Sequence, residues 1–151
     1  MKIMKQIFIC IVILSLGSCG YEAIYLKKEN FNTAIQSFQT EGNKGINRKI
    51  LSALNLKKQT KTNGYKLKIN SSKSLVSVSK DSKGKTSVYN LKVDVVVSLI
   101  NEDKVFKTKN FTSNFTYNNT ENKYDLSQYQ NDVETNLIDQ IIEEIFIFLT
   151  F

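Results

Sequence analysis

Cys19 is the residue whose chemistry is best defined by its neighbours. It follows Leu16-Gly17-Ser18 at the end of an apolar run that begins at Ile7, and Lys2 and Lys5 precede that run. This order of positive, apolar and small residues is typical of a secretory signal peptide. The run of roughly ten residues is too short for a membrane-spanning helix, which needs about 20. The segment resembles a bacterial lipobox, in which the cysteine thiol forms a thioether with diacylglycerol before cleavage.

We therefore predict that residues 1–18 are removed by cleavage between Ser18 and Cys19. Cys19 then becomes the lipidated first residue of a tether, residues 19–32, which precedes a single domain, residues 33–151. The alternative is a buried thiol or a disulfide with Cys10, but Cys10 lies in the segment that is removed. The mature chain would then hold no free thiol, disulfide or cysteine-based metal site. Gly20 resembles the residue that follows the cysteine in lipoproteins sorted to the outer membrane.

The composition argues against an enzyme. The chain has no histidine, the mature part has no thiol, and no glycine-rich phosphate loop is present. The usual nucleophile–base pairs and metal-ligand clusters are therefore missing, so we expect no cofactor and no metal. Glu143 and Glu144 are adjacent carboxylates, but consecutive residues of a helix point about 100° apart. The formal charge of +7 falls to +5 when Lys2 and Lys5 are removed. In the periplasm this excess suits anionic lipid or an acidic partner rather than nucleic acid.

Two groups of lysines lie near predicted hairpin turns. Lys80, Lys83 and Lys85 surround a turn at 81–84, with Lys73 nearby, and a second group surrounds a turn at 101–104. One interpretation is a solvated, charged hairpin tip. The other is a docking surface for phosphorylated glycolipid headgroups, where ammonium groups act as point charges on phosphate. The sequence alone leaves both open.

The hydrophobic pattern predicts an α+β domain with the order β-α-β-β-β-α. A strand is expected at 33–41, an amphipathic helix at 45–57, and a three-strand meander from Tyr65 to Asn118 with turns at 81–84 and 101–104. The strand at 89–100 alternates most strictly. A helix of about 24 residues follows, with Asp125 or Ser127 as its N-cap. We expect a two-layer sandwich, with about four strands in a mixed sheet and two helices on one face.

The C-terminal end is apolar on nearly all sides from Ile145 to Phe151. A final phenylalanine after alternating apolar residues is also typical of outer-membrane barrels, but Glu143-Glu144 interrupts that pattern and the helical period persists upstream. A two-layer domain buries only one stripe of a helix. We therefore predict that Phe146, Phe148 and Phe151 contact a partner or the bilayer.

Three segments resemble the LPS-assembly lipoprotein family, LptE or rare lipoprotein B. They are Cys19-Gly20-Tyr21 with the nearby Ile24-Tyr25, the strand SVYNLKVDVVVSLINEDKVF, and the tract YDLSQYQNDVETNLIDQIIEEI. The family usually has a Pro-Leu-Tyr-like segment where this chain has Ala23-Ile24-Tyr25. The resemblance covers most of the mature chain and lies in the order of elements rather than in one diagnostic motif.

The resemblance implies a non-enzymatic outer-membrane lipoprotein on the periplasmic side. Such proteins plug a large barrel partner, LptD, and assist its assembly and the delivery of lipopolysaccharide to the outer leaflet. It also implies that Lys80, Lys83 and Lys85, near a hairpin end, contact lipopolysaccharide. The alternative is a general envelope lipoprotein that binds a protein partner, such as a peptidoglycan enzyme, without touching lipopolysaccharide.

Overall fold

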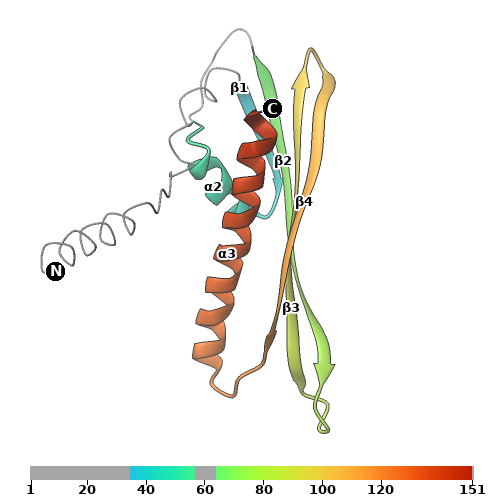
Figure 1. Cartoon of the computed structure of the whole chain (residues 1–151), viewed down its shortest axis with the longest axis vertical. Helices are drawn as coiled ribbons and strands as arrows, with labels where there is room; N and C mark the ends of the chain where they lie inside the picture. Colours follow the sequence, from blue (N-terminus) through green and yellow to red (C-terminus); the bar gives the residue numbers. More distant parts are fainter. Residues whose placement is uncertain (1–34, 57–63, 151) are drawn as a thin grey trace, which may run out of the picture.

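The computed structural model describes residues 35–56 and 64–150 (Figure 1). Its elements follow the predicted order. They are β1 (Ile35–Gly42), α2 (Lys44–Ala53), β2 (Tyr65–Lys80), β3 (Thr86–Asn101), β4 (Lys104–Asn118) and α3 (Lys123–Thr150). The predicted signal peptide, the lipidation site and the tether lie outside the described residues.

The four strands form one mixed sheet in the order β1-β2-β3-β4. β2, β3 and β4 are antiparallel neighbours, whereas β1 pairs with β2 in parallel, from Ile35 opposite Tyr65 to Gly42 opposite Ser71. Parallel neighbours need a crossover connection, and α2 lies within it. Because β1 has 8 residues and β2 has 16, the second half of β2 has no neighbour on that side within the described sheet.

Both helices lie on one face of the sheet (Figure 1), as the pattern predicts. The alternation of β3 is confirmed, because one set of its side chains is buried under the helices: Leu91, Val93, Val95, Val97 and Leu99. β4 adds Phe111 and Tyr117 to this layer, and α3 adds an apolar stripe from Val133 to Phe148. The opposite face of the sheet is polar. On it Thr112 donates a hydrogen bond to Asp94, and the hydroxyls of Ser98 and Thr108 share another.

α3 is longer than predicted and begins at a different cap. It has 28 residues, and the side chain of Asn122 accepts a hydrogen bond from the backbone amide of Tyr124. The prediction of Asp125 or Ser127 as N-cap was therefore wrong. Asn is as good a cap as Asp or Ser because its carbonyl oxygen satisfies a free amide in the first turn. At 1.5 Å per residue the helix is about 42 Å long and follows the length of the sheet.

The connection between β1 and α2 is fixed by polar contacts with β2. Asn43 caps α2 by accepting hydrogen bonds from the amides of Gly45 and Ile46, and its own amide donates to the carbonyl of Ser71 at 2.9 Å. The buried Asn47 donates to the carbonyl of Glu41 and accepts from the hydroxyl of Ser71. These bonds satisfy the polar groups that the crossover buries.

Two predicted boundaries differ from the structure. The helix expected at 45–57 ends at Ala53, and Asn55 then takes a left-handed φ of 51° that an α-helix cannot continue. The strand expected at 33–41 is observed as Ile35–Gly42, and Thr33 lies outside the described residues. No helix in the described parts of the chain is both long and apolar enough to span a bilayer.

Candidate functional site

The turn between β2 and β3 holds the first group of lysines at one end of the molecule. Asp81 builds it, because its carboxylate accepts hydrogen bonds from the amides of Lys83 and Lys85, each at 2.9 Å. The amide of Gly84 donates to the carbonyl of Asp81, and Gly84 has a φ of +78° that favours glycine. The turn therefore uses its one carboxylate to hold its own backbone.

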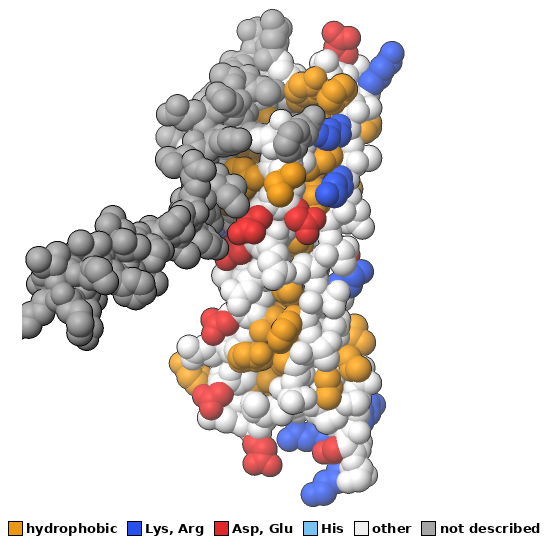
Figure 2. Space-filling view, in the orientation of Figure 1, with side chains coloured by type: hydrophobic (Ala, Val, Ile, Leu, Met, Phe, Trp, Pro, Cys, Tyr) orange, Lys and Arg blue, Asp and Glu red, His pale blue; other side chains and the backbone are white. Residues whose placement is uncertain are grey.

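All three lysines of this turn, Lys80, Lys83 and Lys85, are exposed, and none forms an ion pair with a described residue. Three ammonium groups against the single carboxylate of Asp81 leave a local excess of two positive charges. Figure 2 shows basic side chains gathered at this end of the molecule, where the strands turn. We define Lys80, Lys83 and Lys85 with Asp81 as the basic turn. Its chemistry is that of a small set of exposed cations suited to phosphate.

Three other lysines, Lys73, Lys107 and Lys109, have partners inside the domain, whereas Lys104 at the second turn is exposed. Lys73 lies 2.8 Å from the carboxylate of Glu134 on α3, so it is separate from the basic turn. Lys107 donates to the carbonyl of Phe148 and lies 4.3 Å from the centre of that ring. Lys109 lies 3.9 Å from Glu144 and 4.8 Å from the ring centre of Phe111. The two groups of lysines, which the sequence left equivalent, therefore differ in the structure. Lys107 and Lys109 contact α3, whereas the lysines of the basic turn form no ion pair with a described residue.

The aromatic residues predicted to meet a partner differ in position. Phe148 is 8% exposed and packs edge to face on Phe111, with ring centres 5.7 Å apart, so its side chain belongs to the core of the domain. Phe146 is half-buried beside that core, and Phe151 lies outside the described residues. Ile147, which the sequence analysis did not single out, is 58% exposed.

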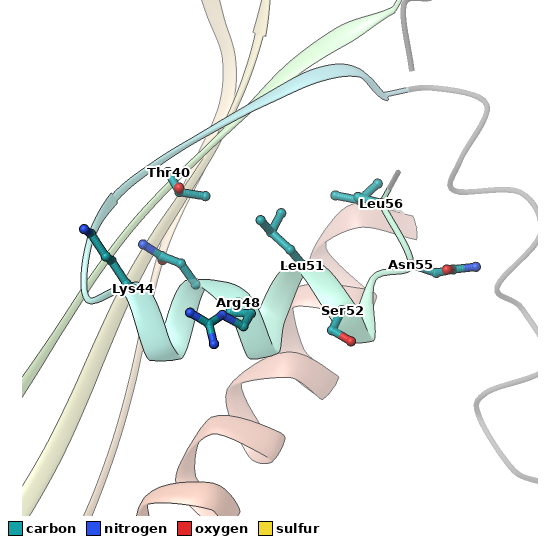
Figure 3. Close-up of a pocket in the computed structure, with 8 residues that line it drawn as sticks. Thr40, Lys44, Arg48, Leu51, Ser52, Asn55 and Leu56 are labelled. Carbon is teal, nitrogen blue, oxygen red and sulfur yellow. The ribbon is translucent and has the colours of Figure 1, made fainter. Parts of the chain in front are cut away.

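A second candidate is an open cavity of about 440 Å³ between β1 and α2 (Figure 3). Lys44 and Arg48 line it from one side of α2, together with Thr40, Leu51 and Leu56. The sequence analysis missed this pair of cations, although four-residue spacing places Lys44 and Arg48 on one face of a helix. The cavity can attract an anion, but its lining holds no carboxylate, and the buried Asn47 is already hydrogen-bonded to Glu41 and Ser71.

The described part of the chain offers little for catalysis. Within residues 35–56 and 64–150, no group of three or more potential ligands from Asp, Glu, His or Cys is placed to hold a metal ion. Hydrogen bonding to Thr112 lowers the pKa of Asp94, and burial raises the pKa of Tyr117. These two groups lie on opposite faces of the sheet, and neither lines the basic turn or the cavity.

Several solved structures share this fold. Rare lipoprotein B from Shewanella oneidensis superposes with a TM-score of 0.51 at 12% identity, covering 72% of this chain and 92% of that one. A minor lipoprotein from Acinetobacter baumannii gives 0.55 at 12% identity, covering 73% and 87%. This chain has the rare lipoprotein B fold. A protein from Caulobacter crescentus also shares it, with a TM-score of 0.56 at 16% identity, covering 82% and 92%.

The rare lipoprotein B fold agrees with the family resemblance drawn from the sequence. No protein-family model matches the chain, and no characterised protein sequence matches it closely. The likeness therefore lies in the arrangement of elements, where the sequence analysis also placed it. All three of these structures carry the word lipoprotein in their names, in keeping with the lipobox predicted to end at Cys19.

Proposed function

We propose that this chain is an outer-membrane lipoprotein that plugs an LptD-type barrel and assists its assembly. The observation that carries the proposal is the rare lipoprotein B fold, which covers about nine-tenths of the Shewanella oneidensis protein. The lipobox cysteine, Cys19, supports the same assignment because it would anchor the domain to a membrane through acyl chains. In this proposal the protein has no catalytic role and faces the periplasm.

The basic turn is the proposed contact with lipopolysaccharide. Its three lysines are exposed, and their charge is not cancelled by ion pairs within the described domain. Ammonium groups bind phosphate as point charges without a fixed geometry, which suits the phosphorylated headgroup of a mobile lipid. At the other hairpin Lys107 and Lys109 contact α3, which makes these two poorer candidates.

The last turns of α3 are a second proposed contact, here with the barrel. Phe146 is half-buried, so part of its ring is left uncovered by the domain. Phe148 supports the end from inside by packing on Phe111. Phe151 remains part of the proposal from the sequence alone.

The direct test is purification of the tagged, lipidated protein from outer membranes in mild detergent. The proposal predicts recovery of a large β-barrel in equal amount. Recovery of a periplasmic enzyme without a barrel would overturn it in favour of a general envelope lipoprotein. Purification of a chain with Cys19→Ser, which cannot be acylated, serves as the control for anchoring.

The role of the basic turn is tested by charge reversal. A variant with Lys80→Glu, Lys83→Glu and Lys85→Glu should lose lipopolysaccharide binding, and binding by the unchanged protein should weaken as salt rises. A matched variant with Lys49→Glu, Lys66→Glu and Lys104→Glu changes the net charge equally at exposed positions outside the turn and the cavity. Equal loss in both variants would show a general charge effect and would contradict a site at the turn.

A further inference from the structure

The end of the molecule opposite the basic turn carries exposed apolar side chains. Val105 is 61% exposed, Phe106 is 64% exposed and Ile147 is 58% exposed, and Tyr65 is half-buried beside them. We define Tyr65, Val105, Phe106 and Ile147 as the apolar end. Figure 2 shows hydrophobic side chains gathered where α3 reaches its C-terminus. Large side chains left in water cost free energy, so a group of them on one end indicates a contact surface.

The apolar end is built by three different elements that are tied together. The ring of Phe106 on β4 lies 5.1 Å from that of Tyr65 on β2, measured between ring centres. The β3–β4 register shifts between Leu99 and Ile100, which leaves Phe106 without a partner on β3. Lys107 then bonds to the carbonyl of Phe148, which joins the start of β4 to the last turn of α3. Phe106 is therefore held outward by the ladder rather than left there by a loose loop.

The chain enters the domain at this same end. Ile35, the first residue of β1, is paired with Tyr65, whose ring packs on Phe106. Residues 19–34 precede Ile35, and 16 residues span at most about 55 Å when fully extended. A lipid on Cys19 therefore keeps the apolar end close to the bilayer that holds the anchor. Tethering of this kind raises the effective concentration to the millimolar range, so a weak contact is sufficient.

We propose that the apolar end inserts into the interfacial layer of the membrane that carries the lipid anchor. The inference rests on the lipidation of Cys19 in the proposed function. The occupant is lipid rather than a second copy of the chain, because the tether fixes the distance of this end from the bilayer but not from another molecule. Phe and Tyr rings with aliphatic neighbours suit the boundary between headgroups and acyl chains.

Charge at this end favours apolar insertion over electrostatic attraction. The β3–β4 turn holds Glu102 and Asp103 beside Lys104, and Lys107 is engaged with Phe148. The carboxylates and ammonium groups nearly cancel, so anionic headgroups gain little from this end. Binding should therefore depend on Val105, Phe106 and Ile147 and should persist at high salt, in contrast to the basic turn.

The test uses the lipidated mature chain in vesicles of phosphatidylethanolamine and phosphatidylglycerol. Cys19 is acylated and the mature chain has no other cysteine, so Val105→Cys supplies a single thiol for an environment-sensitive fluorophore. The label should emit at shorter wavelength in vesicles than in detergent-free buffer and should lose intensity when the acyl chains are brominated. The same label at Ser82→Cys, in the basic turn, should do neither.

A second variant separates insertion from general stickiness. Phe106→Ser and Ile147→Ser, added to the labelled Val105→Cys chain, should restore a water-like emission of the label. The fold is retained because both side chains are exposed. Phe115→Ser, which removes an exposed aromatic residue from the other half of β4, should leave the emission unchanged. Equal quenching at positions 82 and 105, or quenching that survives removal of Phe106 and Ile147, would overturn the proposal. A shift to shorter wavelength without quenching by brominated lipid would show that protein, not lipid, covers this end.

The outcome is independent of the barrel. The vesicles contain no protein partner, so failure here leaves the barrel proposal standing, and failure to purify a barrel leaves the vesicle result standing.

Discussion

Gly42 stands where β1 ends, at a φ of +83° that side chains rarely adopt. A Cβ at this position would lie 1.9 Å from the carbonyl oxygen of Ser71, an atom that also accepts the amide of Asn43. Gly84 has a similar φ of +78°, yet its Cβ would meet nothing within 4 Å. The two glycines thus share a positive φ that would strain any residue with a side chain, and they differ in the space around them.

This pair gives the first prediction. Gly84→Ala should lower the free energy of unfolding by about 1–2 kcal/mol, the cost of a left-handed residue with a side chain. Gly42→Ala should cost about 3 kcal/mol more, because the crossover must also move away from β2. Urea unfolding of both variants measures the difference. Equal losses would show that the contact of Gly42 with Ser71 is not a constraint on the fold.

Asp94 gives a prediction about pH. Its carboxylate accepts a hydrogen bond of 2.6 Å from Thr112 and lies 3.0 Å from the ammonium of Lys92, and the first of these is the main cause of its lowered pKa. A carboxyl whose folded pKa is lowered stabilises the fold above its ordinary value of 3.8, and this stabilisation is lost as pH falls through the folded pKa. Thr112→Val should therefore raise the pKa of Asp94 toward 3.8 and reduce stability at neutral pH but not in strong acid.

The measurement is an NMR titration of the Asp94 carboxyl together with urea unfolding at neutral and acidic pH. Thr108→Val is the control, because that hydroxyl on the same strand bonds to Ser98 and touches no carboxylate. Its effect on stability should be independent of pH. An unchanged pKa of Asp94 in the Thr112 variant would contradict the assignment.

Residue identity predicted some side-chain positions and missed others. Strand alternation puts Phe111, Phe115 and Tyr117 on one side of β4, and their pairing with Val95, Leu91 and Tyr89 agrees. Phe115 is nevertheless 44% exposed, whereas Phe111 is buried. A strand pattern gives the face of the sheet, but the path of α3 across that face decides which residues it covers, and the strand does not encode that path.

Among the elements, β2 is an interior strand that becomes an edge strand halfway along its length. β1 ends opposite Ser71, so Ser72–Lys80 shows an open side on which Leu75, Val76 and Val78 are exposed. Unpaired strand edges with apolar side chains favour aggregation, and a charge placed within them blocks it. Val76→Lys should therefore slow aggregation on heating while changing the free energy of unfolding by less than about 0.5 kcal/mol.

The control for this element is Val96→Lys. Val96 is 40% exposed on the same polar face, but it lies on β3, which has a neighbour on both sides. Its charge should improve solubility less than the charge at Val76, as light scattering during heating would show. Similar protection by both variants would mean that net charge, not the open edge, controls aggregation.

Elements with strong periodicity were predictable, and the pairing between them was not. The strict alternation of β3 and the apolar stripe of α3 required one buried face each, so their existence and type followed from the sequence. The parallel pairing of β1 with β2 depends on bonds among Asn43, Asn47 and Ser71, which are far apart in sequence. The cap at Asn122 was missed because several polar residues near the helix start can serve equally well.

At the scale of the whole molecule the domain is a long rod with different ends. β3 has 16 residues, which at about 3.3 Å each separate the apolar end from the basic turn by about 50 Å. A bilayer is about 40–45 Å thick with its headgroups. If the apolar end lies at the inner surface and the domain stands inside a barrel, the basic turn must reach the outer surface.

This geometry predicts which residue is accessible from outside the cell. A Ser82→Cys variant should react in intact cells with a maleimide that cannot cross membranes, because its turn would stand at the outer mouth of the barrel. Ser52→Cys, exposed on α2 on the side of the domain where the chain enters, should react only after the outer membrane is opened. Labelling of Ser82→Cys should also disappear in cells depleted of the barrel. Reaction of both cysteines only in opened cells would place the whole domain in the periplasm and would contradict the upright plug.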